Sequence, residues 1–390
     1  MTQQYIVTNF AYGTGPYLRT TDFAIAVNDE FERNGQQRLP AIIPWVYGEK
    51  QKRVMLEEFA EYEKKHPGEL LLDAELGAIL KSIFYGDSAY EDALERWSIS
   101  VREVSAKAHA HLAGTFTAET LSGEKRMVDG RGIALELNRS PRLRYDVAPS
   151  YFTSFAYIAE ILEASLREPA GKIAVQPELV KAGIEAANWV ERGHRVYCIS
   201  YPATFSYDAA YRPRYEGEML VPPMGSVPQA NSELLEPGIF VTITGIPGLE
   251  RLYEDARRLG IRLYSNDTSA VPGSMRALPH VITNKNILFQ FARSGWSSVW
   301  LSMIVGTPLV IPDFDSKDDP EIYFNNRAVE RLGIGAVYRR EPLEAILEKR
   351  EGIRTASAAL VASIRTRWGT LDGTAYVARL VVRDFLARRA

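Results

Sequence analysis

Short apolar runs alternate along the chain with longer stretches in which apolar residues recur at helical spacing. The run YIVTNF (5–10) predicts a strand, and a loop with Gly13 and Gly15 follows it. Residues 20–33 place their apolar side chains on one helical face, and the pair Asn34-Gly35 predicts the end of that helix. Repetition of this order predicts an α/β fold with parallel sheets flanked by helices.

The alternation continues to residue 210 and then stops. Residues 69–80 have helical spacing, whereas residues 211–237 contain five of the chain's 21 prolines and have no sustained periodicity. A second series begins at residue 238, in which NKNILFQFA (284–292) is predicted as a short helix. Since 390 residues exceed the size of one hydrophobic core, we interpret the proline-rich segment as a linker between two domains.

The stretch from Phe291 to Asp315 carries the clearest chemical signal. The triplet Arg293-Ser294-Gly295 precedes a predicted helix that has Ser297 and Ser298 in its first turn. Unpaired N–H groups, hydroxyls and the helix dipole then converge on one point, which suits a phosphate. Capping of an ordinary helix by Ser and Gly is the alternative.

The residues after this helix predict the opposite side of a binding site. Gly306-Thr307-Pro308 ends the helix, and LVIP (309–312) predicts a buried strand. Acidic residues lie between Asp313 and Glu321, at the carboxyl end of this strand. Open α/β sheets bind their ligands at that edge.

Composition and charge narrow the classes of protein. The formal net charge of −3 provides no general attraction to nucleic acid or anionic lipid. The single cysteine, Cys198, lies in an apolar run, which favours a buried inert thiol over a reactive one. The beginning of the sequence has no signal-peptide pattern and no run approaches a membrane span, so we expect a cytoplasmic protein and leave peripheral membrane contact open.

Residues 293–338 resemble the donor-binding region of nucleotide-sugar glycosyltransferases that have two facing Rossmann-like domains, the GT-B fold. The pattern is similar to that of the N-acetylglucosaminyltransferase of lipid II synthesis and the related UDP-glycosyltransferases. The matching elements are Arg293-Ser294-Gly295, Ser298, Gly306-Thr307-Pro308, Asp319-Pro320-Glu321, Asn325 and Leu332-Gly333. The resemblance implies an acceptor-binding domain (1–222), a donor-binding domain (223–372) and a final helix (373–390) that packs back on the first domain.

The same resemblance implies an enzyme that transfers a hexose from a nucleotide-diphosphate sugar, with UDP favoured, to an acceptor hydroxyl of a small molecule, a glycan or a lipid-linked compound. The implied donor-binding residues are Gly15, Thr244, Gly245, Arg293, Ser294, Gly295, Ser297, Ser298, Asp319, Glu321 and Asn325. Ser297 or Ser298 would hold the diphosphate, and Asp319 and Glu321 would reach the sugar hydroxyls. For Glu321, an exposed turn residue is the alternative.

Three positions depart from the family pattern. Leu301 stands where relatives carry a ribose-binding glutamate, and Arg293 and Leu301 stand where retaining relatives carry two glutamates, which favours inversion. Tyr17 replaces the histidine of the lipid II enzyme, and a phenol is a poor base near neutral pH. Asp22 and His109 are therefore our candidates for the general base, with a packed or solvated helix residue as the alternative for His109.

Asp313-Phe314-Asp315 has the D-x-D form of a metal-binding motif in another glycosyltransferase architecture. Hard cations need more oxygen ligands than one tripeptide specifies, so we expect no metal and no cofactor. A nucleotide-sugar 2-epimerase and a non-catalytic nucleotide-sugar binding module stay open as alternatives. An NAD-dependent enzyme is disfavoured because the Gly13-Thr14-Gly15 loop lacks the third glycine of the fingerprint.

Overall fold

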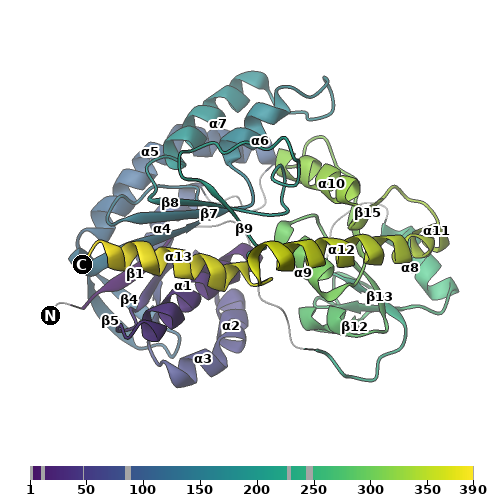
Figure 1. Cartoon of the computed structure of the whole chain (residues 1–390), viewed down its shortest axis with the longest axis horizontal. Helices are drawn as coiled ribbons and strands as arrows, with labels where there is room; N and C mark the ends of the chain where they lie inside the picture. The colour runs from purple at the N-terminus through teal and green to yellow at the C-terminus, as the bar shows by residue number, and fades with distance from the viewer. Residues whose placement is uncertain are drawn as a thin grey trace. The chain divides into compact units, whose positions relative to one another are not determined.

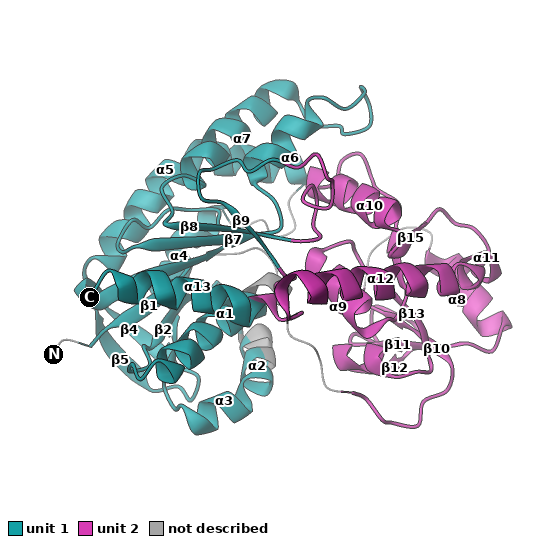
Figure 2. Cartoon of the chain, in the orientation of Figure 1, with its two compact units in different colours: residues 1–200, 212–221, 374–390 teal, residues 201–211, 222–373 magenta. Residues whose placement is uncertain are grey.

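The chain forms two compact units. The computed structural model describes residues 3–9, 14–46, 48–83, 89–225, 230–242 and 249–389. Unit 1 comprises residues 1–200, 212–221 and 374–390, and unit 2 comprises residues 201–211 and 222–373 (Figure 2). The domain boundary predicted at 222/223 therefore differs for residues 201–211. This segment is anchored in unit 2, where the Trp300 indole donates to the carbonyl oxygen of Pro202 at 2.7 Å.

Unit 1 is built on one sheet that has nine strands among the described residues, in the order β5-β4-β3-β2-β1-β6-β7-β8-β9. The run β3-β2-β1-β6-β7-β8-β9 pairs in parallel throughout. Strand β4 pairs antiparallel with β3, and β5 pairs antiparallel with β4 at the edge of the sheet. The strands are β1 (Tyr5–Thr8), β2 (Ala41–Pro44), β3 (Leu70–Asp73), β4 (Thr115–Thr120), β5 (Lys125–Asp129), β6 (Ile133–Arg139), β7 (Ser150–Ser154), β8 (Val196–Ser200) and β9 (Met219–Val221). The helices are α1 (Thr14–Arg33), α2 (Glu49–Glu58), α3 (Ala60–Lys65), α4 (Ala74–Leu80), α5 (Tyr90–Leu112), α6 (Ile158–Ser165), α7 (Pro177–Val190) and α13 (Gly373–Ala387) (Figure 1).

Unit 2 has a sheet of six strands within the described residues, all parallel, in the order β12-β11-β10-β13-β14-β15. The strands are β10 (Gly238–Val241), β11 (Arg262–Ser265), β12 (Met275–Arg276), β13 (Ile287–Phe291), β14 (Leu309–Pro312) and β15 (Gly335–Tyr338). The helices are α8 (Leu249–Arg258), α9 (Trp296–Val305), α10 (Pro320–Leu332), α11 (Leu343–Glu348) and α12 (Arg350–Trp368). Both units are thus α/β units, as predicted, with a mainly parallel sheet in unit 1 and a parallel sheet in unit 2.

One predicted helix is wrong, and another is wrong only in its first part. Residues 284–292 contain β13, which pairs with β10 and β14 in the middle of the sheet of unit 2. Residues 69–80 contain β3 followed by α4, because Asp73 ends the strand and accepts the Leu76 N–H at 2.9 Å as the helix cap. In both cases a short apolar run that is buried on all sides has no periodicity that would distinguish strand from helix.

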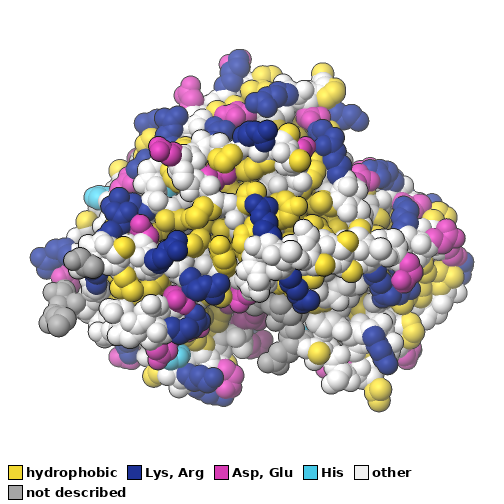
Figure 3. All heavy atoms as spheres, in the orientation of Figure 1, with side chains coloured by type: hydrophobic (Ala, Val, Ile, Leu, Met, Phe, Trp, Pro, Cys, Tyr) yellow, Lys and Arg dark blue, Asp and Glu magenta, His cyan; other side chains and the backbone are white. Residues whose placement is uncertain are grey.

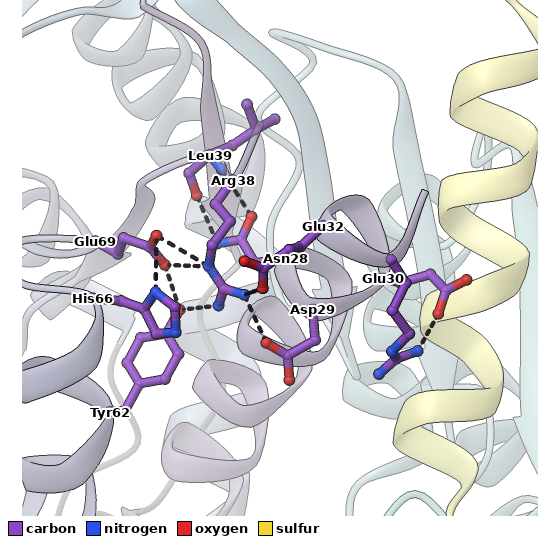
Figure 4. Close-up of polar contacts among 10 residues, drawn as sticks. Asn28, Asp29, Glu30, Glu32, Arg38, Leu39, Tyr62, His66 and Glu69 are labelled. Atoms are coloured by element: carbon purple, nitrogen blue, oxygen red, sulfur yellow. Dashed lines mark hydrogen bonds and ion pairs between the residues drawn. The ribbon is translucent and has the colours of Figure 1, made fainter. Parts of the chain in front are cut away.

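Partly buried Arg38 joins α1 to the segment that leads into β3 (Figure 4). Its guanidinium donates to Asp29 at 2.8 Å, to both carboxylate oxygens of Glu69 at 3.0 Å and to the Tyr62 hydroxyl at 2.8 Å. Burial disfavours the charge, but these partners outweigh it and raise the pKa of Arg38. The cluster holds the C-terminal half of α1 beside β2 and β3.

Helix α13 lies along α1 in unit 1 (Figure 1). The ring of Phe385 packs edge-on against Phe31 with centroids 5.2 Å apart, and the Tyr151 hydroxyl donates to Asp384 at 2.9 Å. The end of the chain is therefore part of the core of unit 1. None of the helices in the described ranges is long and apolar enough to cross a membrane.

Candidate active site

Helix α9 begins at the carboxyl end of the central strand β13 in unit 2. Gly295 is its N-cap residue and makes no side-chain capping bond, while Ser297 is exposed and Ser298 is half-buried in the first turn. The first N–H groups of a helix have no acceptor within the helix. The predicted helix start with Ser297 and Ser298 in its first turn is confirmed, and the binding of an anion there stays a prediction.

The residues just before α9 differ in exposure. Arg293 is 52% exposed, and its guanidinium donates to the carboxylate of Asp318 at 2.7 Å. Ser294 is buried, and its hydroxyl lies 3.5 Å from the carbonyl oxygen of Ile322. Only Arg293 of this pair is accessible to a ligand at the start of α9.

Helix α10 begins at the end of the loop that follows β14. The Asp319 carboxylate caps it by accepting the Glu321 N–H at 2.9 Å, and Pro320 occupies the first turn. The Glu321 carboxylate accepts a hydrogen bond from the Asn325 amide at 3.2 Å. Glu321 and Asn325 are four residues apart, so they lie on the same face of α10.

The Asn325 amide joins α9 to α10. Its oxygen accepts the Trp296 indole N–H at 2.8 Å and the Thr204 hydroxyl at 2.7 Å, and its nitrogen donates to Glu321. Asn325 is fully buried. A direct contact between Asn325 and a donor remains a prediction, but its link to both helix starts is a property of the fold that sequence reasoning missed.

The remaining donor-side residues vary in their placement. Thr244 and Gly245 lie outside the described residues, and Gly15 lies in the first turn of α1. Leu301 packs against a cluster around Phe240 and Tyr264 in the core of unit 2, so this position faces the protein interior. Its side chain belongs to the packing of α9 against the sheet.

The aspartates of the D-x-D tripeptide bond to the local backbone. Asp313 accepts the Phe314 N–H at 3.1 Å and Asp315 accepts the Lys317 N–H at 3.0 Å. Among the described residues, no group of three or more His, Cys, Asp or Glu side chains could hold a metal ion. Cys198 is buried, and burial raises the pKa of its thiol to about 12.

Asp22 lies in unit 1, two turns into α1, in a cluster of four charged side chains. It forms an ion pair with Arg19, which also donates to Glu58 at 3.4 Å. Arg139, at the carboxyl end of β6, is buried, and its pKa is lowered to about 10 by burial and then by the charge of Arg19. Burial raises the pKa of Asp22 above its ordinary value, with Glu58 acting in the same direction and both arginines against it.

The two histidines of α5 have different surroundings. His109 is exposed, and its Nδ1 donates to the carbonyl oxygen of Tyr145 at 2.8 Å. His111 is nearly buried, and its Nε2 lies 2.8 Å from the carboxylate of Asp73. Burial disfavours the imidazolium, but Asp73 and then Glu75 raise the pKa of His111 overall. The sequence contains no signal for this pair, because its members are 38 residues apart.

Charged side chains of both signs are interspersed over the viewed face (Figure 3).

No protein-family model matches the chain, and no curated protein sequence is similar to it. Solved structures are similar over the full length. The crystal structure of CalG4, the calicheamicin glycosyltransferase, has a TM-score of 0.56 and 15% identity over 100% of both chains. UGT71G1 of Medicago truncatula, complexed with UDP-glucose, has a TM-score of 0.55 and 12% identity over 98% of both chains. TcCGT1 in complex with UDP has a TM-score of 0.61 and 11% identity over 99% of this chain and 100% of that one.

The chain has the GT-B fold. Each unit supplies one Rossmann-like half of it, unit 1 with Asp22 and unit 2 with the starts of α9 and α10. In a GT-B fold the carboxyl ends of the parallel strands are the places where ligands bind. Of the described candidates, Asp22 lies in α1, which follows β1, and Arg293 and Glu321 lie in the segments that follow β13 and β14.

Proposed function

We propose that the protein is a glycosyltransferase that moves a hexose from a nucleotide-diphosphate sugar to an acceptor hydroxyl. The observation that carries the proposal is the Asn325 amide, which bonds both Trp296 at the start of α9 and Glu321 at the start of α10. A helix start suited to a diphosphate and a carboxylate suited to sugar hydroxyls thereby belong to one hydrogen-bonded cluster. Neighbours of the same fold in complex with UDP-glucose and with UDP support a UDP-sugar as donor.

In the proposed reaction, the acceptor oxygen forms a bond to the anomeric carbon while the bond from that carbon to the diphosphate oxygen breaks. A single displacement of this kind inverts the configuration at the anomeric carbon. The negative charge that develops on the leaving diphosphate is stabilised by the first turn of α9, with Ser297 and Ser298, and by Arg293, so no metal is required. Thr244 and Gly245 remain predicted contacts of the donor.

Asp22 is the proposed general base that takes the proton from the acceptor hydroxyl. Its raised pKa supports this role, because a base that titrates nearer the working pH removes a proton more effectively in the transition state. His109 remains the second candidate.

The activity is tested with the purified protein and a panel of UDP-, GDP- and dTDP-sugars, each with and without a panel of hydroxyl acceptors. We expect release of the free nucleotide only when an acceptor is present. Epimerisation of the donor without an acceptor would establish the 2-epimerase instead, and donor binding without turnover would establish the binding module. A thermal-shift screen with nucleoside diphosphates identifies the nucleobase of the donor, since a ligand that binds the folded state raises the apparent stability of the protein.

The donor site is tested by Ser298→Ala and Arg293→Ala. Each removes a charge-assisted contact to the diphosphate, so we expect the dissociation constant of the donor to rise about tenfold in each variant. Ser363→Ala and Arg354→Ala on α12 of the same unit are the matched controls. Unchanged donor affinity in both test variants would show that the diphosphate binds elsewhere.

A further inference from the structure

Thr204 lies in the segment 201–211, far from the donor motif in sequence, yet it contacts the residue that joins both halves of that motif. We propose that Thr204 is a positioning residue for donor-sugar recognition, acting on Glu321 through the side chain of Asn325. The inference rests on the proposed function, and it assigns Asn325 an indirect part in donor binding.

The three side chains at the centre of this arrangement are buried and fully bonded to one another. Thr204 donates to the Asn325 oxygen at 2.7 Å, and Trp296 donates to that oxygen at 2.8 Å and to the Thr204 hydroxyl at 2.9 Å. All three residues are at most 2% exposed. The cluster is therefore shielded from water, where hydrogen bonds hold side chains most strictly in place.

The chemistry of these groups permits one orientation of the Asn325 amide. An indole N–H only donates, so it requires the amide oxygen on its side. Because the Thr204 oxygen accepts from the same indole, its own hydrogen is directed to the Asn325 oxygen. The amide nitrogen must then point away from Trp296, toward Glu321, to which it donates at 3.2 Å.

Glu321 is consequently held at two points. Its backbone N–H bonds the Asp319 cap at 2.9 Å, and its carboxylate bonds the Asn325 amide. A carboxylate that recognises a sugar through directed hydrogen bonds depends on such support, because a loosely held side chain must lose its rotamer freedom when the ligand binds. Thr204 is one of the two hydrogen-bond donors that orient the Asn325 amide toward Glu321.

The test compares Thr204→Val, which keeps the shape and removes the hydroxyl, with Thr204→Ser, which restores it. Dissociation constants are measured by calorimetry for UDP and for the UDP-sugar that binds the wild-type chain most tightly. We expect Thr204→Val to weaken the UDP-sugar about tenfold while the affinity for UDP stays the same. Thr204→Ser should recover most of the loss.

The matched control is Ser302→Ala on α9, which removes another buried hydroxyl of unit 2, one that donates to Gln290 at 2.7 Å. Equal weakening of UDP and UDP-sugar in Thr204→Val, or no weakening of either, would overturn the inference and leave the proposed function standing. A wild-type chain that binds no nucleotide sugar at all would overturn the proposed function itself.

Discussion

The two candidates for the general base differ in the side chains and backbone groups that surround them. Asp22 and His109 were chosen from sequence as bases, and each has a different environment in the structure. Asp22 is enclosed by Arg19, Glu58 and Arg139, whereas the ring of exposed His109 bonds one carbonyl oxygen. The environment of Asp22 raises its pKa toward the working range of a base.

We predict that Asp22→Asn lowers kcat at least about 100-fold, the usual contribution of a general base. In the wild-type protein the acidic limb of kcat/KM should lie above the ordinary pKa of an aspartate, because the base must be ionised and its pKa is raised. Glu58→Gln removes a negative neighbour that raises the pKa of Asp22, so the limb should move to lower pH.

Glu57→Gln is the control for this measurement, since it makes the same change of charge at the adjacent exposed position of α2. A limb that moves equally in both variants would reflect the overall charge of the protein. A limb that moves in neither, together with full activity of Asp22→Asn, would contradict the role of Asp22 and favour His109.

Among the secondary-structure elements, the first turns of α9 and α10 form the candidate donor site. Gly295 caps α9 without a side-chain bond, and Asp319 caps α10 with its carboxylate. Gly306 and Gly333 end the two helices with positive φ values of 76° and 67°, a conformation that glycine adopts without strain. The start of α9 and its stop at Gly306 were predicted from the sequence, because capping depends on local residues, whereas the cap of α10 at Asp319 was not predicted.

We predict that Asp319→Ala lowers the free energy of unfolding of unit 2 by about 1 kcal/mol, the usual cost of losing a helix cap. Asp319→Asn should lose only a few tenths, because an amide oxygen also accepts the Glu321 N–H. Hydrogen exchange of the amides of α9 and α10 in urea measures both variants, since these helices lie in unit 2. Unchanged donor affinity in Asp319→Asn would indicate that Asp319 serves the site only as a cap.

At the scale of the whole molecule, the chain passes between its two units several times. Residues 201–211 belong to unit 2 although unit 1 continues at residue 212, and the last helix returns to unit 1. The core of unit 1 therefore contains residues from both ends of the sequence, such as Phe31 and Phe385.

We predict that Phe385→Ala destabilises unit 1 by about 3 kcal/mol, because it leaves a cavity where a buried ring packed. Hydrogen exchange should show faster exchange in α1 and in the strands of unit 1. Arg383→Ala on the exposed face of α13 is the control and should change stability by less than about 0.5 kcal/mol. Unchanged exchange in unit 1 would mean that α13 does not contribute to its core.

The sequence by itself determined the α/β class and the helix start at Arg293 to Ser298, because strand alternation and capping depend on residues close together in the chain. The tertiary structure alone decided that residues 287–291 form a strand, that His111 rather than His109 meets a carboxylate, and that Thr204 bonds Asn325. These outcomes depend on burial between sheet neighbours or on side chains separated by 38 and 121 residues. Periodicity and residue spacing do not predict such contacts, because they form only when the elements pack together.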